Sequence, residues 1–399
     1  MRILIISNAI PYPTDSGSKV RSYNLLRRVA KKHEVWFATL TDGAEEAEGL
    51  SHIGQICSGV ETVALRRRHL LMHVPGLLRY ALAGNPLELK FVHYEELVRK
   101  IQRLFTTTDF DIVQIEPSQM ALYIETLPTD AGFKSLLMFH NVAYNQYYHI
   151  FRFAPRLVSR MRALLHSLMM RRWEPRYAER FDRCITVSEE DRRLLLAVDP
   201  RLQVDVIPNG VDTSIYHVQP KEYRTPDLLF VGNLGYTACS DAATYFCREI
   251  LPIVRRVMSD VEMWIVGTNP PPEVTRLQGD GVHITGRVDS VLPYYRQSSV
   301  CVVPLRIGGG SRLKILEAMA MGRPVVSTSV GAEGLDVVAD EHILIADTPD
   351  EFARKIVLLL QNARLSDRIA ASARQLVEAH YDWDVIAQRL MRAYAQMVD

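Results

Sequence analysis

The chain has 399 residues, of which 48% are apolar and 23% are charged, and its formal net charge is +1. This composition excludes a disordered or fibrous protein and predicts a globular chain with room for two domains and sizeable cores. We expect no nucleic acid among its partners.

The N-terminal stretch MRILIISNAIPYP has too short an apolar core for a signal peptide, and no run of about 18 uncharged apolar residues could span a bilayer. We therefore expect a cytoplasmic protein. The five cysteines are scattered and include no CxxC pair, so neither a disulfide framework nor a zinc site is indicated. No metal and no cofactor are expected.

Short apolar runs alternate with helical patterns along the chain. Continuous apolar strands between helices are typical of parallel sheets covered on both faces, so the predicted fold class is α/β with two Rossmann-like domains. The expected strands are RILII (2–6), EVWFATL (34–40), DIVQIE (111–116), SLLMFH (135–140) and CITVS (184–188) in the first half, and LLFVG (228–232), EMWIVG (262–267), VHITG (282–286), SVCVVP (299–304) and PVVST (324–328) in the second.

The domain boundary is expected near VIPNGVD (206–212), because a strand-like segment ends there in a Pro-Asn-Gly turn. We assign residues 1–205 to an N-terminal domain and residues 206–375 to a C-terminal domain. Residues 376–399 are expected to form a C-terminal helix that crosses back to the N-terminal domain.

Two segments of the first half could meet a ligand beyond the C-terminal ends of strands. Gly17 and Ser18 open a helix after the first strand, with Lys19 and Arg21 nearby, although an ordinary exposed loop-to-helix start gives the same pattern. His140 ends the SLLMFH strand, where its side chain would face a ligand, and a structural histidine is the alternative.

The segment PLRIGGGSRLKILEAMAMGRPVVST (304–328) combines a strand end, three glycines and a helix that starts with two cations. Glycines let the backbone approach a ligand closely, and cations in a first helical turn oppose the helix dipole unless an anion binds. Arg312 and Lys314 are therefore expected to neutralise a diphosphate, and Glu317 to accept hydrogen bonds from paired hydroxyls such as those of ribose. The alternative is a glycine-rich turn with a solvated helix start.

Residues 151–181 carry eight arginines against two acids, with Leu157, Met161, Leu164, Leu165, Leu168 and Met169 near helical spacing. A basic amphipathic helix can lie on an anionic membrane surface, together with Arg66 to Arg68 and the LLMHVPGLL that follows. The alternative is that the Leu/Met stripe packs on the sheet of the first domain while the arginine stems snorkel. We expect peripheral attachment to the inner membrane face under the first interpretation.

The segments VIPNGVD (206–212), VGN (231–233), GRV (286–288) and LEAMAMGRPVVST (316–328) resemble glycosyltransferase family 4, whose members have the GT-B fold and are mostly retaining enzymes. The resemblance covers nearly the whole chain, and the last block is its most specific part. It implies two Rossmann-like domains with parallel sheets that face each other across a cleft. It also implies a nucleotide-diphosphate sugar held mainly by the C-terminal domain and an acceptor held by the N-terminal domain.

The resemblance also implies roles for individual residues. Glu317 matches the second glutamate of the family's Glu-x7-Glu motif and would hold the ribose, while Gly310 and Ser311 would face donor phosphate and sugar. His140 matches the histidine near the donor sugar. The remaining donor-binding positions are Gly17 and Ser18 in the N-terminal glycine loop, Gly232 and Asn233 after the first strand of the second domain, and Arg287 in the segment that frames the nucleobase.

Two positions depart from the family pattern. The first glutamate of the motif, which usually binds sugar hydroxyls, is replaced by Gly309, and the segment GNLGYTACSDA (232–242) lacks the family's usual Arg and Lys. Arg312 and Lys314 could supply the missing charge and stabilise the departing diphosphate.

The predicted function is transfer of a sugar, with retention, from a UDP- or GDP-type donor to a hydroxyl of a glycan or lipid-linked acceptor in polysaccharide or glycoconjugate biosynthesis. The departing phosphate would assist deprotonation of the acceptor, as the resemblance implies. A catalytically silent nucleotide-sugar-binding protein and a nucleotide-sugar epimerase are the alternatives.

Overall fold

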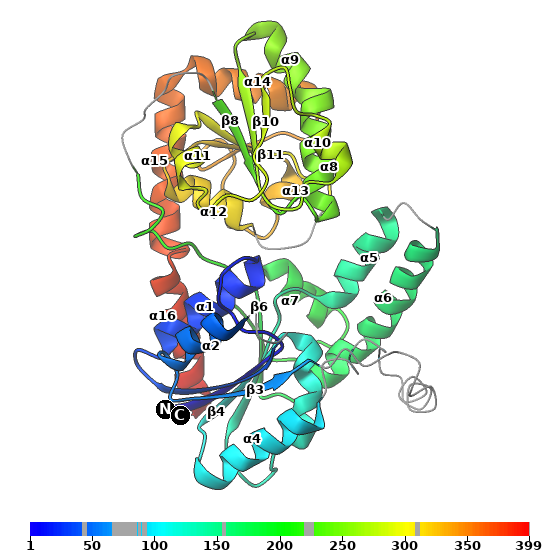
Figure 1. Ribbon diagram of the computed structural model, residues 1–399, viewed down its shortest axis with the longest axis vertical. Helices are drawn as coiled ribbons and strands as arrows, with labels where there is room; N and C mark the ends of the chain where they lie inside the picture. The colour runs from blue at the N-terminus through cyan, green and yellow to red at the C-terminus, as the bar shows by residue number, and fades with distance from the viewer. Residues whose placement is uncertain are drawn as a thin grey trace. The chain divides into compact units, whose positions relative to one another are not determined.

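The computed structural model describes residues 1–41, 46–65, 86, 89, 94–153, 157–218, 227–307 and 312–398. The chain divides into two compact units (Figure 1). Unit 1 comprises Met1–Pro208 and Ile386–Asp399, and unit 2 comprises Asn209–Gly308 and Arg312–Val385.

Unit 1 is built on a parallel sheet of seven strands in the order β3-β2-β1-β4-β5-β6-β7. The central strands are almost wholly buried because helices cover both faces of the sheet, as a parallel sheet requires. The strands are β1 (Arg2–Ser7), β2 (Glu34–Thr41), β3 (Gly59–Ala64), β4 (Ile112–Glu116), β5 (Lys134–Met138), β6 (Arg183–Thr186) and β7 (Val204–Val206).

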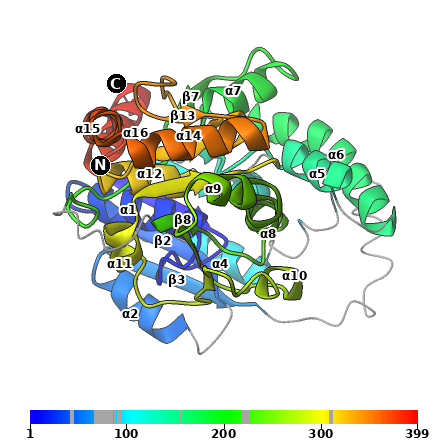
Figure 2. The ribbon, with the colours of Figure 1, turned by 90° about the horizontal axis from the view of Figure 1, so that it is seen from above.

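Helices of unit 1 begin shortly after the ends of β1, β4, β5 and β6. Two of them, α5 (Ala143–Phe153) and α6 (Leu157–Ala178), lie side by side and project from the rest of the unit (Figure 2). The others are α1 (Gly17–Val29), α2 (Ala47–Gly54), α4 (Glu95–Thr107), the 3-10 helix η4 (Ser118–Thr126) and α7 (Glu189–Leu196).

Unit 2 repeats the plan with a parallel sheet of six strands in the order β10-β9-β8-β11-β12-β13. The strands are β8 (Asp227–Val231), β9 (Glu262–Val266), β10 (Val282–Ile284), β11 (Val300–Val303), β12 (Val325–Ser327) and β13 (Leu344–Ile345). The helices are α8 (Thr237–Tyr245), a π-helical turn η5 (Phe246–Ile250), α9 (Leu251–Val257), α10 (Pro272–Thr275), α11 (Leu292–Gln297), α12 (Leu313–Ala320), α13 (Ser329–Ala332), α14 (Pro349–Gln361) and α15 (Ala363–His380).

The last helix, α16 (Trp383–Val398), begins in unit 2 and belongs to unit 1 from Ile386 onward. In unit 1 it buries Ile386, Leu390 and Tyr394, and the Tyr394 hydroxyl donates a hydrogen bond to Oε1 of Gln114 in β4. The C-terminal segment therefore contributes to the interior of the unit that contains the N-terminus.

All ten strands expected from the sequence overlap an observed strand. The expectation of two Rossmann-like α/β domains is thereby confirmed. Among the described residues, none of the helices is long and apolar enough to cross a bilayer.

Candidate functional site

Lys314 belongs to α12, and its side chain reaches the C-terminal end of β8, the first strand of unit 2. Its Nζ is 4.4 Å from the centre of the Phe230 ring and 3.4 Å from Sγ of Cys239. A side chain at position 232 would bring its Cβ to 2.8 Å from this Nζ, so Gly232 leaves the space that the ammonium group occupies. Lys314 forms no ion pair within the described part of the chain, and sulfur is a weak acceptor, so the group is poised for an anion.

Glu317 lies one helical turn after Lys314 on α12, and two tyrosines hold its carboxylate. The Tyr295 hydroxyl of α11 donates to Oε2 at 2.9 Å, and Tyr216 also donates to this carboxyl. Burial raises the pKa of Glu317, while the two tyrosines and the charge of Lys314 oppose that shift. A carboxylate has lone pairs for about four hydrogen bonds, so two tyrosines leave room for paired ribose hydroxyls.

Arg312, at the N-cap position of α12, is directed into unit 2. Its Nη2 donates to the Val330 carbonyl at 2.9 Å and lies 3.0 Å from Oε2 of Glu333, and its Nε donates to the Glu333 carbonyl at 3.2 Å. The side chain is buried. These contacts tie the start of α12 to the end of α13, so in this structure Arg312 positions the helix start, and a contact with phosphate stays a prediction.

Asn233 and Gly267 shape the strand ends next to Lys314. The Asn233 side-chain oxygen accepts a hydrogen bond from the Gly235 amide at 3.0 Å, which fixes the turn after β8. A Cβ at Gly267, just after β9, would lie 1.7 Å from the Gly232 carbonyl oxygen. Only glycine allows the two loops to approach so closely.

Arg287 is exposed just beyond β10 and follows Gly286, whose φ of 66° lies in the left-handed region. Its position at a strand end of unit 2 is compatible with the expected contact to a nucleobase. Gly309, Gly310 and Ser311 lie outside the described residues.

In unit 1, His140 lies just beyond β5, next to a carboxylate that the sequence interpretation overlooked. Its Nε2 is 3.9 Å from Oε2 of Glu116, the last residue of the neighbouring strand β4. This separation is too long for a hydrogen bond, so the buried Nε2 has no hydrogen-bond partner among the described residues. Glu116 and His140 are each the last residue of an expected strand, and this position could have indicated from the sequence that the two side chains lie near each other.

Glu116 is charged despite its burial. Burial opposes the charged form, but His140, Ser22 and Arg21 outweigh it and hold the pKa of the Glu116 carboxyl below its usual value. Oε2 of Glu116 also accepts a hydrogen bond of 2.9 Å from the Gln114 side chain.

A second buried carboxylate, Glu174 of α6, fixes the loops that follow β4 and β5. Oε1 accepts hydrogen bonds from the Ser118 hydroxyl at 2.9 Å and the Ala143 amide at 3.0 Å, and Oε2 accepts one from the Tyr144 amide at 3.1 Å. Ala143 and Tyr144 begin α5, so Glu174 satisfies two otherwise unpaired amides of that helix. It thereby fixes the chain directly after His140.

Gly17 and Ser18 form the first turn of α1. No side chain caps this turn, and it contains no acidic residue, so its amides and helix dipole favour an anion. Lys19 forms an ion pair with Asp15 at 3.2 Å. Arg21 is buried and donates at 2.8 Å to the carbonyls of Ile207 and Pro208, so it supports the end of unit 1.

A small cavity in unit 1 lies among α1, β4 and α16, with Ser22, Gln114, Glu116 and Tyr394 in its wall. Its volume of about 10 Å³ corresponds to one water molecule at most. It is therefore too small for a sugar or a nucleotide.

Known proteins match both units. The model described as Glycosyltransferase Family 4 matches residues 16–215, and the model described as Glycosyl transferases group 1 matches residues 225–362. An uncharacterised 44.6 kDa protein in the cps region of Klebsiella pneumoniae is 24% identical over 398 residues, with 96% of each chain covered. A phosphatidyl-myo-inositol mannosyltransferase of Mycobacterium leprae is 30% identical over 205 residues, which are 47% of this chain and 52% of that one, so the match spans about half of that relative.

Two solved structures have the same fold over the whole chain. Sucrose-phosphate synthase from Thermosynechococcus elongatus aligns with a TM-score of 0.71 at 18% identity, covering 99% of both chains. HepE of Anabaena, in complex with UDP and glucose, aligns with a TM-score of 0.69 at 16% identity, again covering 99% of both chains.

Two parallel-sheet Rossmann-like units, together with these structural neighbours, define the GT-B class of glycosyltransferases. Since the first family model matches half of the sequence, the chain belongs to glycosyltransferase family 4. It is a hexosyltransferase-type glycosyltransferase, which confirms the resemblance noted from the sequence.

Proposed function

We propose that this glycosyltransferase moves a sugar from a UDP- or GDP-type nucleotide sugar to a hydroxyl of a glycan or lipid-linked acceptor, with retention, in polysaccharide or glycoconjugate biosynthesis. The observation that carries the proposal is the pair formed by Lys314 and Glu317. A cation with no ion-pair partner in the described chain lies at the end of β8, and a carboxylate held by two tyrosines lies one helical turn away. A nucleotide presents the matching groups, a diphosphate and a ribose.

Lys314 would contact the diphosphate and stabilise the negative charge that develops as the sugar leaves. Gly232 and Asn233 would border the same anion at the end of β8. Arg312 would act mainly by fixing the start of α12, which places Lys314 and Glu317. Lys314 would thus contact the donor directly, whereas Arg312 would position the helix that carries Lys314.

His140 would act on the donor sugar, and the neighbouring Glu116 carboxylate would orient it. The Nε2 atom of His140 is buried and has no hydrogen-bond partner among the described residues, and a sugar hydroxyl or phosphate oxygen would satisfy it. The uncapped start of α1, with Gly17 and Ser18, would favour a phosphate or another anionic group of the substrates.

The relatives support a nucleotide-sugar donor and leave its identity to experiment. One relative is a GDP-mannose-dependent mannosyltransferase of Mycobacterium tuberculosis, whereas HepE of Anabaena was crystallised with UDP-glucose. A thermal-shift panel of UDP-, GDP- and ADP-sugars tests the donor base directly. Turnover of the best binder with lipid-linked acceptors then tests transfer.

The panel also separates the alternatives. Binding of a nucleotide sugar without transfer or hydrolysis would favour a catalytically silent binding protein, and interconversion of the free nucleotide sugar would favour an epimerase. Stabilisation by none of the nucleotides would contradict the proposed function.

A further inference from the structure

One face of α6 exposes a stripe of large apolar side chains. Leu157, Val158, Met161, Leu165 and Leu168 are between 52% and 81% exposed. Positions 157, 161, 165 and 168 recur at helical spacing and therefore share a face. Together with Val158 they form what we call the α6 stripe.

The opposite face of the same helix is the one that packs on unit 1. Met170, Trp173 and Tyr177 belong to its core, and Ser167 donates a hydrogen bond of 2.7 Å to the Tyr144 carbonyl of α5. The alternative interpretation of the sequence, in which the whole Leu/Met stripe packs on the sheet, is therefore wrong for Leu157, Met161, Leu165 and Leu168. Leu164 and Met169 are half-buried.

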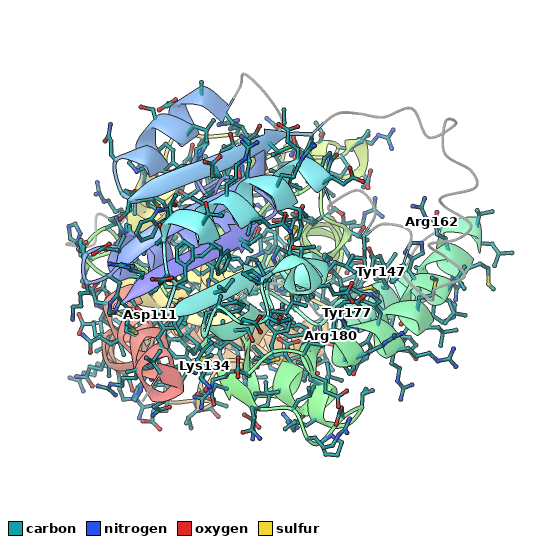
Figure 3. All side chains as sticks on the ribbon, turned by 90° about the horizontal axis from the view of Figure 1, so that it is seen from below. Asp111, Lys134, Tyr147, Arg162, Tyr177 and Arg180 are labelled. Atoms are coloured by element: carbon teal, nitrogen blue, oxygen red, sulfur yellow. The ribbon has the colours of Figure 1, made fainter. Side chains whose placement is uncertain are left out.

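Exposed apolar residues are concentrated on the projecting helix pair. Of the 15 large apolar residues that are exposed in the described chain, 7 lie on α5 and α6, namely the α6 stripe with Tyr148 and Ile150 of α5. Single exposed apolar residues are common on protein surfaces, whereas a contiguous group marks an interaction site. Figure 3 shows Arg162 toward the outer part of this pair and Tyr177 and Arg180 toward its base.

The charges around the stripe are positive. Arg171, Arg172 and Arg176 are exposed and form no ion pair with any residue that the structure describes. The only acid within α6 is Glu174, which is buried and occupied with the start of α5. The surface thus offers apolar side chains in its outer half and unpaired arginines in the half nearer the core.

We propose that the α6 stripe docks on an anionic lipid bilayer, with the apolar side chains among the acyl chains and Arg171, Arg172 and Arg176 at the headgroups. Exposed apolar side chains next to exposed arginines are the combination that binds the acyl chains and the anionic headgroups of a bilayer surface. A parallel pairing with a second copy is disfavoured because it would bring the same arginines together, and an antiparallel pairing is an outcome that the test below detects. Docking would bring a lipid-linked acceptor within reach, and this part of the inference rests on the proposed function. Binding to the bilayer itself requires no sugar transfer.

The test is binding of the full chain to vesicles of phosphatidylcholine alone and of phosphatidylcholine mixed with phosphatidylglycerol. We expect binding only to the anionic vesicles, and weakening by added salt. Arg171→Gln combined with Arg172→Gln should weaken it by about fivefold per arginine, and Met161→Ser combined with Leu165→Ser by about tenfold or more. Leu358→Ser and Arg256→Gln, at exposed positions of unit 2, are matched controls that should leave it unchanged.

Nucleotide-sugar binding by the same variants, measured without vesicles, separates this proposal from the proposed function. Normal nucleotide binding with lost vesicle binding supports docking whatever the acceptor is. Equal binding to neutral and anionic vesicles, binding to neither, or unchanged binding by both double variants would overturn it. A stable dimer that the Met161→Ser/Leu165→Ser variant converts to a monomer would also overturn it, because the stripe would then be a contact between copies.

Discussion

Substitution of Glu317 tests whether its carboxylate binds ribose or only accepts hydrogen bonds from two tyrosines. Glu317→Ala removes the acceptor of the Tyr216 and Tyr295 hydroxyls and the proposed partner of the ribose. We expect it to weaken binding of the nucleoside diphosphate by about 1.5–3 kcal/mol, the cost of leaving polar groups unpaired. Titration calorimetry with the free nucleotide measures this loss.

The control is Tyr295→Phe, which removes a hydrogen bond to the same carboxylate and leaves the carboxylate in place. It should weaken nucleotide binding less than Glu317→Ala does. Unchanged affinity in Glu317→Ala would show that the carboxylate serves the tyrosines alone and does not hold ribose.

Glu174 accepts hydrogen bonds from the first amides of α5, and its titration predicts that the stability of the fold depends on pH. Burial raises the pKa of Glu174 to about 7, against about 4.3 for an unfolded glutamate. Between these values the folded state binds more protons, so the stability that the neutral carboxyl contributes is complete at low pH and is lost as the pH rises through about 7.

The measurement is the melting temperature of the wild type and of Glu174→Gln from about pH 4.5 to about pH 8. We expect the wild type to lose stability relative to the variant as the pH rises toward 7 and to run parallel to it above that pH. Shifts that both proteins share, such as that of Glu116, cancel in the difference. A difference that does not change with pH would contradict the assignment.

At the scale of elements, the close approach of two strand ends in unit 2 is a sharp constraint. A Cβ at Gly267 would lie 1.7 Å from the Gly232 carbonyl, so Gly267→Ala must separate the ends of β8 and β9. We expect a loss of about 2 kcal/mol or more and weaker nucleotide binding, because Lys314 depends on the same strand end. Gly54→Ala, in α2, meets no atom within 4 Å and should be neutral or slightly stabilising.

Strands and helices could be predicted from the sequence more fully than the contacts between residues of different elements. Continuous apolar runs identified β1, β4 and β5, whereas β3 was not predicted because it is a half-buried edge strand whose Glu61 and Thr62 interrupt the apolar pattern. The positions of Lys314 and Glu317 on one helix followed from spacing. The Glu116–His140 pair did not, because it depends on β4 and β5 being adjacent in the sheet.

The buried hydrogen-bond partners of Arg312 and Glu174 could not be predicted from the sequence. Arg312 was expected to face a diphosphate, yet its guanidinium contacts the end of α13, and only the three-dimensional arrangement reveals those carbonyls. Glu174 stands in an arginine-rich helix and gives no sign in the sequence that it caps α5. Residues that serve the backbone of another element have no local pattern by which to be recognised.

For the whole molecule, α16 makes the C-terminus part of unit 1. A chain that ends at residue 385 would expose the pocket for Ile386, Leu390 and Tyr394, all of which are almost fully buried. Each buried side chain of this size contributes about 1.5–3 kcal/mol, so unit 1 should melt several degrees earlier or not fold. Scanning calorimetry, which resolves separate transitions in multidomain chains, measures this, and an unchanged profile would contradict the role of α16.

Lys314 decides the central claim, that unit 2 binds a nucleotide-diphosphate sugar through a cation at the end of β8. The measurement is titration calorimetry of the preferred nucleoside diphosphate and of its nucleoside with the wild type and Lys314→Met. We predict that the variant binds the diphosphate about tenfold or more weakly and binds the nucleoside, which lacks phosphate, with unchanged affinity. Equal loss for both ligands, or no loss for the diphosphate, would contradict the claim.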